Sequence, residues 1–276
     1  MNCRICNSPT VETQRVGKTD MLHCRSCDAT YLAAMPAAQE QREYYEHEYK
    51  LSQSAPDLTE LRRQSRWSEN LRLVKAVRES APINASLLDV GCDRGYFLDE
   101  ARRWGISAVG MEPSEQGRDY AKSIGLHVTQ SLEEYDGRHF DIITMWHVLE
   151  HISDPLSMLS DLHSRLEPGG RIHIRVPNFA SFSSHLLGSA WIWFQPHNHV
   201  FHYSIRSLSV VLQTAGFELE FVRSQRPNSL LTLLEFLTTN WSLWRSGSET
   251  ASLRSWGSTL VQYFSGVELY AVARRK

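Results

Sequence analysis

The sequence lacks any run of about 18 consecutive apolar residues, the length that a membrane-spanning helix requires. The closest candidate, SLLTLLEFLTTNWSLW at 229–244, is interrupted by Glu235 and Asn240. We therefore predict an amphipathic helix there that packs on the core or caps a substrate, with contact to a membrane surface as the alternative. No transmembrane segment is expected.

The N-terminal residues, MNCRICNSPT, lack the apolar core of a signal peptide. An excess of basic charge is missing too, since 29 lysines and arginines face 31 aspartates and glutamates, for a net charge of -2. A broad nucleic-acid surface normally requires a basic patch, so this balance argues against nucleic acid as a partner. We expect a cytoplasmic protein.

Cysteine is scarce, and four of the five cysteines form two pairs, Cys3-x-x-Cys6 and Cys24-x-x-Cys27. Each C-x-x-C turn presents two thiolates on one side of a tight loop, and two such loops complete the tetrahedron that zinc prefers. The pattern predicts a zinc-ribbon-like module whose ion is structural, because four cysteine ligands leave no open position. Two disulfides are the alternative, and nothing in the sequence marks secretion.

From residue 86 onward, short apolar runs alternate with amphipathic segments, which predicts a mostly parallel sheet with helices on both faces. The expected strands are 86–91, 107–113, 126–130, 140–148 and 171–178, followed by a final antiparallel edge strand at about 267–275. The expected helices are 57–79, 96–105, 114–125 and 154–170. Ligands in such folds bind at the carboxyl ends of the strands.

The first of these strands runs into the segment DVGCDRG at 89–95. Glycines at this place let the backbone approach a ligand and open the next helix. Glu112 ends the second strand, about twenty residues beyond Gly91, where a carboxylate can accept hydrogen bonds from both ribose hydroxyls of an adenosine. These features predict a ligand that contains an adenosine. An enzyme that binds a dinucleotide would fit them almost as well.

The fourth strand is followed by His147-x-x-Glu150-His151, a spacing that zinc peptidases use. On a helix, these residues would share one face. A peptidase also needs an open cleft and a further ligand. Here the residues come directly after a buried parallel strand, so peptidase activity is the weakest interpretation. We predict that chelation of metal unfolds the N-terminal module and leaves no peptidase activity to abolish.

Four segments in order resemble the motifs of class I S-adenosylmethionine-dependent methyltransferases: LLDVGCDRGYFL, VGMEP, FDIITMWHVLEHISDP and LEPGGRIHIRVPN. HVLEH, VPN and PHNHVFHYS with LQTAGF are similar to the branch that includes ubiquinone-biosynthesis O-methyltransferases and methyltransferases of sugars and surface glycans. The resemblance implies a Rossmann-like α/β fold with a seven-stranded, mostly parallel sheet, and S-adenosylmethionine as the cofactor.

Three parts of the chain follow from these patterns. We expect a zinc-binding module at 1–35, a helical linker or cap at 36–80, and the methyltransferase domain at 81–276. Two insertions of that domain, 178–204 and 227–260, are expected to line the acceptor pocket.

The resemblance also implies which residues bind the cofactor: Asp89, Gly91, Cys92, Asp93, Gly95, Met111, Glu112, Pro113, Ser131, Leu132, Trp146 and His147. Four of them, Gly91, Cys92, Asp93 and Gly95, would wrap the methionine end. Glu112 would hold the ribose, and Met111 and Pro113 would flank the adenine. Ser131 and Leu132 would meet the adenine edge. The family usually has glycine where this chain has Asp93, whose carboxylate could pair with the cofactor's ammonium or impair binding. We expect binding to be retained.

A hydroxyl acceptor needs a base within hydrogen-bond reach of its proton. The histidine candidates are His147, His151, His197, His199 and His202. We predict His151 and His197 as bases, with His147 as the third candidate; packing is the alternative for each. Some ubiquinone-type relatives bind a divalent metal at the corresponding place, so a metal held by His147, Glu150 and His151 could lower the pKa of the acceptor hydroxyl.

The predicted function is O-methylation of a small molecule or of a sugar or cell-surface glycan precursor, as in polysaccharide biosynthesis. The alternatives are a ribosomal- or transfer-RNA methyltransferase, a nucleotide-sugar C-methyltransferase, and a non-catalytic scaffold that binds S-adenosylmethionine. The acidic balance disfavours RNA, and Asp93 alone supports the scaffold. The sequence leaves the acceptor and the oligomeric state open.

Overall fold

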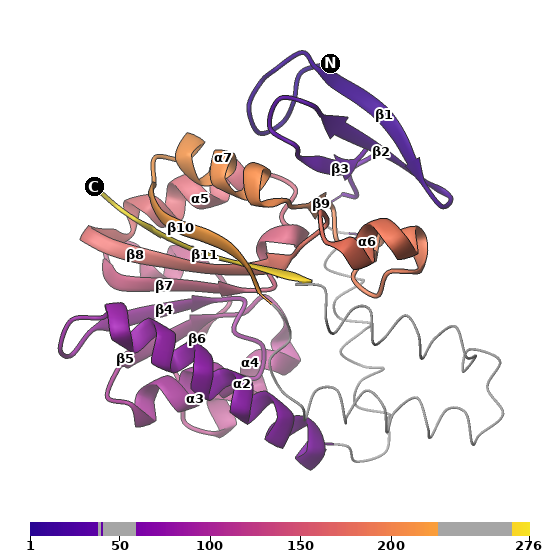
Figure 1. Ribbon diagram of the computed structural model, residues 1–276. Coiled ribbons are helices and arrows are strands. Elements are labelled where there is room, and N and C mark those ends of the chain that lie inside the picture. Colours follow the sequence, from indigo (N-terminus) through magenta and orange to yellow (C-terminus); the bar gives the residue numbers. More distant parts are fainter. Residues whose placement is uncertain (38–39, 41–58, 226–266) are drawn as a thin grey trace, which may run out of the picture.

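The computed structural model describes the chain except for residues 38–39, 41–58 and 226–266. The predicted helix at 229–244 and the predicted insertion at 227–260 lie outside the described residues. The described residues form two β-sheets and the helices that cover them (Figure 1).

The larger sheet has seven strands in the order β10-β11-β8-β7-β4-β5-β6. Their bounds, in chain order, are β4 (Ser86–Val90), β5 (Ser107–Met111), β6 (Val128–Thr129), β7 (Phe140–Trp146), β8 (Leu166–Pro177), β10 (Glu218–Gln225) and β11 (Glu268–Arg274). The neighbours from β8 to β6 are parallel, and β11 is antiparallel to both β8 and β10. The mostly parallel sheet is as the sequence predicts.

The position of the last strand differs from the prediction. The sequence pattern places β11 at the edge, but it lies between β10 and β8, and β10 forms the edge. β11 is buried from Glu268 to Ala273, as expected for a strand with neighbours on both sides. Local sequence predicts the strand, whereas its place in the sheet depends on partners far away in the chain.

Helices cover both faces of this sheet (Figure 1). Their bounds are α2 (Thr59–Ser80), α3 (Tyr96–Arg103), α4 (Glu115–Ser123), α5 (Pro155–Ser164), α6 (Phe182–Leu187) and α7 (Ile205–Thr214), with 3-10 turns η1 (Leu132–Tyr135), η2 (Leu149–His151) and η3 (Gly188–Ala190). Successive strand residues point to opposite faces. Leu87 and Ile142 therefore pack with residues of α2 and α3, whereas Leu88 and Ile143 pack with residues of α5 and α7.

Helix α5 is shorter than the predicted 154–170. Asp154 caps its start by accepting a hydrogen bond from the Ser157 N–H at 3.2 Å, and Pro155 occupies the first helical position. The helix ends at Ser164, and the EPGG stretch already belongs to β8, with an irregular register against β7. Proline and glycine disfavour a helix, and here the helix ends before it reaches the proline and the glycines.

The N-terminal module does not form a sheet by itself. Its strands β1 (Val11–Val16), β2 (Thr19–Cys24) and β3 (Thr30–Leu32) are joined by β9 (Phe201–His202), a strand from the predicted 178–204 insertion. Figure 1 shows this sheet at the N-terminus, above the ends of the large sheet near α6. The buried residues of the module belong to the same core as those under α5 and α7. None of the helices in the described part of the chain is long and apolar enough to cross a membrane.

Candidate functional site

The loop after β4 depends on two glycines. Gly91 and Gly95 have φ angles of 71° and 75°, in the left-handed region that L side chains rarely adopt. A Cβ on Gly91 would lie 2.5 Å from Val148 Cγ2, and a Cβ on Gly95 would overlap Leu126. The loop therefore lies directly against the turn that follows β7, and no other residue type fits without movement.

Glu112 holds this loop in place. One carboxylate oxygen accepts the Asp93 N–H at 2.9 Å, and the other accepts the Ser114 N–H at 2.8 Å. Asp93 itself has a φ of 49°, a conformation that glycine adopts more readily and that aspartate tolerates better than most residues. Burial raises the pKa of Glu112 to about 7 despite these two hydrogen bonds.

Two buried side chains support the same loop from below. Asp89 accepts a hydrogen bond from the Thr144 hydroxyl at 2.7 Å, and burial raises the pKa of its carboxyl to about 8. The Cys92 thiol would lie 2.5 Å from a Cβ on Gly110, so glycine at that position leaves room for it. Burial raises the pKa of Cys92, which keeps this thiol protonated.

The other residues predicted to bind the cofactor also lie at carboxyl ends of strands. Met111 ends β5 and is buried, Pro113 follows Glu112 and is exposed, and Ser131 caps η1 beside the buried Leu132. Trp146 ends β7, packs edge-on against Phe97 at 5.3 Å, and has a buried indole N–H without a hydrogen-bond partner in the described chain. These positions share the edge of the sheet at which ligands bind in such folds.

A second polar cluster lies where β7 ends. Atoms of Glu150, His151 and His199 that could ligate a metal lie within 4.8 Å of one another. Glu150 is 1% exposed, and neither carboxylate oxygen has a hydrogen-bond partner among the described residues. Buried polar atoms are rarely left unpaired. This cluster therefore has the character of a binding site for an ion or a polar ligand.

Both histidines of the cluster are oriented by backbone carbonyls. Nδ1 of His151 lies 3.0 Å from the Asn198 carbonyl oxygen, and Nδ1 of His199 lies 2.8 Å from the Trp193 carbonyl oxygen. A carbonyl only accepts, so each Nδ1 carries the hydrogen, and Nε2 is the atom of each ring that can present a lone pair. Burial lowers the pKa of His199 to about 4, so this ring is neutral at pH 7.

His147 lies between two carboxylates. Its Nδ1 is 3.5 Å from Glu150 Oε1, its Nε2 is 3.3 Å from Glu268 Oε1, and its ring stacks on Trp193 at 5.0 Å. Burial alone would lower its pKa, but the two carboxylates raise it to about 9. Arg175 contacts the other oxygen of Glu268 and so fixes that carboxylate. His147 is therefore a cation at neutral pH.

The structure brings some predicted bases together and separates others. His151 lies in the cluster, whereas His197 is exposed on the turn before β9. His199 is buried and takes the place beside Glu150 and His151. The 147–151 residues do not form a helical face, because His147 has a φ of 57° and η2 contains three residues. The spacing in HNHVFH gives no sign of which histidine turns inward.

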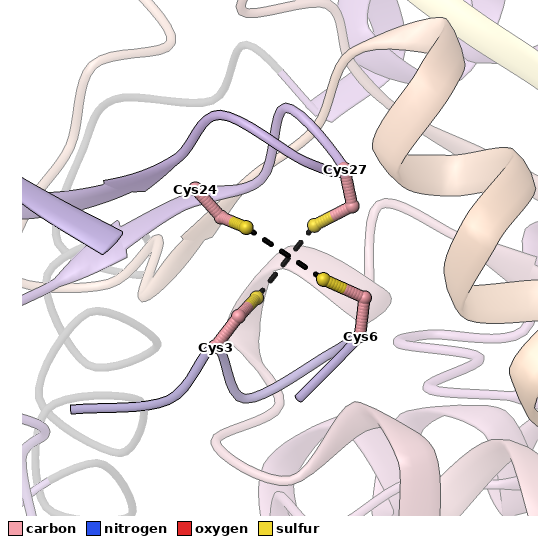
Figure 2. A group of neighbouring side chains, drawn as sticks. All are labelled: Cys3, Cys6, Cys24 and Cys27. Atoms are coloured by element: carbon pink, nitrogen blue, oxygen red, sulfur yellow. Dashed lines mark hydrogen bonds between the residues drawn. The ribbon is translucent and has the colours of Figure 1, made fainter. Parts of the chain in front are cut away.

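The four N-terminal cysteines converge on one point (Figure 2). The Sγ atoms of Cys3 and Cys27 are 3.6 Å apart, as are those of Cys6 and Cys24. A tetrahedral zinc ion with bonds of about 2.3 Å separates its sulfurs by about 3.8 Å, whereas a disulfide holds them at about 2 Å. The cluster is therefore compatible with zinc, and none of the described cysteines forms a disulfide.

The two cysteine turns have the same backbone design. Asn7 and Asp28 follow the two pairs, with φ angles of 55° and 63°. Each donates its N–H to the carbonyl of the first cysteine of its own pair, Asn7 to Cys3 at 3.0 Å and Asp28 to Cys24 at 2.7 Å. Asparagine and aspartate are the residues, after glycine, that enter this conformation most readily. The turns thus hold their thiols in place through the backbone.

Comparison with known proteins is consistent with this geometry. A family model described as a methyltransferase domain matches residues 60–221. The ubiquinone biosynthesis O-methyltransferase of Ruegeria pomeroyi is 35% identical over 96 residues, which are 30% of this chain and 38% of that protein. The enzyme of the same name from Cereibacter sphaeroides is 29% identical over 139 residues, 44% of this chain and 55% of that protein.

Both alignments leave a large part of the curated relatives unmatched, since the chain spans only 38% and 55% of their lengths. Among solved structures, an S-adenosylmethionine-dependent methyltransferase from Thermotoga maritima shares the fold with a TM-score of 0.54 at 18% identity, over 86% of this chain and 99% of that one. The family match over more than half of the chain, together with this fold, shows that the chain belongs to the class I S-adenosylmethionine-dependent methyltransferases.

Proposed function

We propose that the protein transfers the methyl group of S-adenosylmethionine to a hydroxyl group of a small molecule, with a sugar or glycan precursor as the acceptor class. The observation that carries this proposal is Glu150, a buried carboxylate without hydrogen bonds among the described residues that lies beside His151 and His199. The names of the matched relatives, O-methyltransferases, support oxygen as the acceptor atom.

The donor half of the proposed site is the loop 91–95 with Glu112. Each Glu112 oxygen accepts one backbone N–H and retains a lone pair for a ribose hydroxyl. Gly91 and Gly95 let the loop adopt left-handed φ angles and lie against Val148 and Leu126, which shapes the backbone that would meet the methionine end of the donor. Trp146, whose indole N–H has no partner in the described chain, lies at the end of the neighbouring strand.

The acceptor half is the cluster of Glu150, His151 and His199, and these residues fit a divalent metal ion. The Nε2 atoms and a carboxylate oxygen supply the ligands, and the Nδ1 hydrogen bonds to carbonyls are those that metal-binding histidines usually make. His199 replaces His147 in the predicted ligand set. A bound ion would lower the pKa of an acceptor hydroxyl.

His147 has a different role in this proposal. A protonated imidazole cannot accept a proton, so we do not assign the base to His147. Its charge instead compensates Glu150 and Glu268, which keeps both carboxylates ionised in a buried place. In the transfer, the acceptor oxygen bonds to the methyl carbon, the carbon–sulfur bond breaks, and its electron pair stays on sulfur. Without a bound ion, the hydroxyl proton passes to Nε2 of His151; a hydroxyl bound to an ion at the cluster would release its proton to water.

The proposal is tested with the purified full chain, methyl-labelled S-adenosylmethionine and a small-molecule extract. Calorimetry should detect donor binding, and mass spectrometry should detect a labelled product bearing an O-methyl group. Dialysis against a chelator, restoration of Zn²⁺ to the four cysteines at one equivalent, and a comparison with and without added Mg²⁺ or Mn²⁺ decide the role of the cluster. Activity that survives chelation would assign the proton to a histidine instead, and label in RNA or the absence of donor binding would overturn the proposal.

A further inference from the structure

The strand β9 joins the N-terminal module to the acceptor cluster. In the antiparallel pair of β3 and β9, Tyr31 lies opposite Phe201 and Thr30 lies opposite His202. The pairing continues beyond the strand, because the Leu32 N–H donates to the Val200 carbonyl at 3.0 Å. The partners are about 170 residues apart in the chain. Strand β3 of the module is therefore hydrogen-bonded along one edge of the segment that carries His199.

The other side of the same segment is bonded to the turn that carries Glu150. The Val200 N–H donates to the Glu150 carbonyl at 2.9 Å, and the Tyr203 hydroxyl donates to the Leu149 carbonyl at 3.5 Å. The backbone of Val200 thus makes one hydrogen bond to each side. Its N–H donates to Glu150 of the acceptor cluster, and its carbonyl accepts from Leu32 of the module. His199, the neighbouring residue, is held between them.

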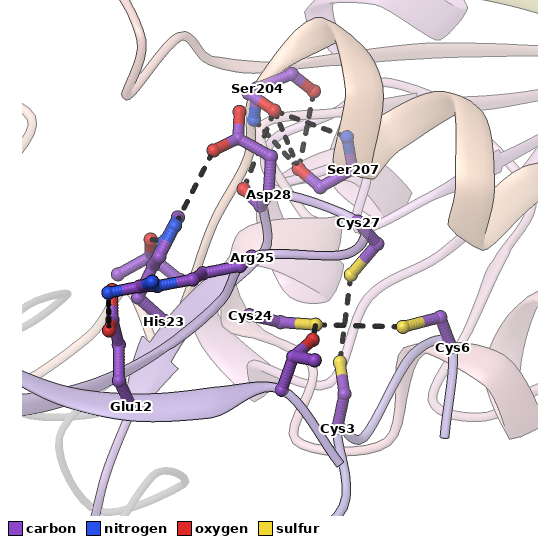
Figure 3. Close-up of polar contacts among 12 residues, drawn as sticks. Cys3, Cys6, Glu12, His23, Cys24, Arg25, Cys27, Asp28, Ser204 and Ser207 are labelled. Atoms are coloured by element: carbon purple, nitrogen blue, oxygen red, sulfur yellow. Dashed lines mark hydrogen bonds and ion pairs between the residues drawn. The ribbon is translucent and has the colours of Figure 1, made fainter. Parts of the chain in front are cut away.

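Two further contacts link the region of Cys24 and Cys27 to this segment: a hydrogen bond from Ser204 and the packing of Tyr31 on Phe201. The Cys24 N–H donates to the Ala29 carbonyl at 2.9 Å, which fixes the backbone just before β3. The Ser204 hydroxyl donates to the Asp28 carbonyl at 3.5 Å (Figure 3). Tyr31 is fully buried, and its ring packs 5.1 Å from that of Phe201. Only residues 28–30 separate Cys27 from Tyr31, so the thiol cluster and this contact move together.

The donor loop obtains its hydrogen bonds elsewhere. The N–H groups of Gly91 and Cys92 donate to the Met111 carbonyl at 2.7 and 3.1 Å, and the Asp93 N–H donates to Glu112. All of these contacts lie within residues 91–112. The two halves of the site are therefore supported by different parts of the chain.

We infer that the cysteine module is a positioning element of the acceptor site: through β3 it holds β9, and thereby His199, against Glu150 and His151. The inference rests on the proposed function in naming this cluster the acceptor site and in taking it to bind a metal ion. Loss of zinc from the four cysteines should loosen residues 199–203 and weaken metal binding at the cluster, while the donor loop keeps its structure.

The test uses the full chain with two variants, Cys24→Ser and Tyr31→Ala, and one matched control, Arg15→Ala. Cys24→Ser removes a thiolate, and Tyr31→Ala breaks the packing on Phe201 but keeps all four cysteines. Arg15 is an exposed residue of the same module that pairs with Asp20 across the β1–β2 hairpin. Zinc content, hydrogen exchange by mass spectrometry, Mn²⁺ affinity and donor affinity are measured for each.

In both variants we expect at least tenfold faster exchange of the amides in 199–203, at least tenfold weaker Mn²⁺ binding, and donor affinity within twofold of the wild type. Arg15→Ala should match the wild type in every readout. Unchanged protection of 199–203 in a variant whose module exchanges freely would overturn the inference, as would an equal loss of donor affinity. If Cys24→Ser does not fold, Tyr31→Ala decides.

Hydrogen exchange separates this inference from the proposed function. If the wild type fails to bind donor but the variants still release 199–203, the proposed function fails and the positioning role of the module stands. If the wild type binds donor but not Mn²⁺, only the metal at the cluster is ruled out. If the wild type binds both and the variants leave 199–203 protected, only the positioning role fails.

Discussion

The donor half and the acceptor half of the proposed site are built in opposite ways. The loop of the donor half, residues 89–95, is closed by backbone hydrogen bonds to Met111 and by Glu112. The acceptor half combines Glu150 and His151 with His199, whose segment contacts His151 from 47 residues further along the chain. Its central carboxylate has no hydrogen bond among the described residues. One half is closed by its own hydrogen bonds, whereas the other keeps a buried carboxylate available to a ligand.

This contrast indicates how proteins of one fold can bind the same methyl donor and yet act on different acceptors. A contiguous loop with satisfied hydrogen bonds tolerates little change, as the close approaches at Gly91 and Gly95 show. The residues of the proposed acceptor half lie on the turn η2 and on the loop before β9, and such connections can vary without disturbing the sheet. Function is located in such attached sites more than in the fold itself.

The largest expected effect is that of Gly91→Ala on the donor half. The new Cβ would be 2.5 Å from Val148 Cγ2, and the left-handed φ adds roughly 1–2 kcal/mol of strain. We expect donor affinity, measured by calorimetry, to fall at least 100-fold. Gly105→Ala is the matched control, because Gly105 has a φ of 73° but no atom within 4 Å of the position that a Cβ would take.

The control carries the same backbone strain without the close contact, so it should lose stability but keep donor affinity. A second change, Val148→Ala, should restore part of the affinity of Gly91→Ala by removing the clashing methyl groups. An affinity of Gly91→Ala equal to that of Gly105→Ala would show that the contact between the loop and the turn is unimportant.

The next effect, Glu150→Gln, should damage only the acceptor half. The amide has the same shape but neither charge nor ligand strength, so we expect methyl transfer to fall at least 100-fold with donor affinity within twofold. Thermal stability should fall, because the change removes the carboxylate that lies 3.5 Å from the His147 cation and leaves that cation with Glu268 alone. The exposed Glu167→Gln serves as the control. Unchanged turnover would remove Glu150 from the mechanism.

The two halves also differ in how far the sequence predicts them. The donor loop can be predicted because strand, glycines and Glu112 follow one another at short range, and the structure places them together. The acceptor cluster can be predicted only in part: the pattern favours His151 together with His197, yet His199 is the residue that faces Glu150. His197 and His199 are separated by Asn198 alone, and no periodicity distinguishes them.

The missing information is non-local. β9 has two residues, too few for a pattern, and its direction is set by pairing with β3, at the other end of the chain. The same reason explains why the sequence predicts β11 as a strand but places it at the wrong position in the sheet. Hydrophobic patterns predict which segments form strands, while long-range pairing decides which strands meet.

A smaller effect is expected on the stability of the acceptor half as the pH changes. The pKa of His147 rises from 6.5 to about 9 on folding, so its contribution is fully present below pH 6.5 and is lost as the pH rises to about 9. It amounts to at most about 3 kcal/mol, and less where water screens the ring. Denaturant unfolding at pH 6.5 and 9 measures it.

The variant His147→Phe keeps the stacking on Trp193 but cannot titrate. Its free energy of unfolding should fall less than that of the wild type between the two pH values. The difference between the two proteins is the relevant quantity, because Asp89 and Glu112 have raised pKa values and titrate in the same range. An identical fall in both proteins would mean that His147 is not held as a cation.

The smallest effect is expected for Asp93→Gly, which gives the donor loop the residue that the family usually has at this position. The hydrogen bond to Glu112 comes from the backbone N–H of residue 93 and does not require the side chain. Glycine relieves the left-handed strain but gains freedom in the unfolded chain, so the two effects oppose each other. We expect donor affinity to change less than threefold.

Asp93→Val is the contrasting variant, since a β-branched residue strongly disfavours this φ, and its donor affinity should fall at least tenfold. A large gain in affinity on Asp93→Gly would instead mean that the aspartate impairs donor binding, and that the donor half is less complete than its hydrogen bonds indicate.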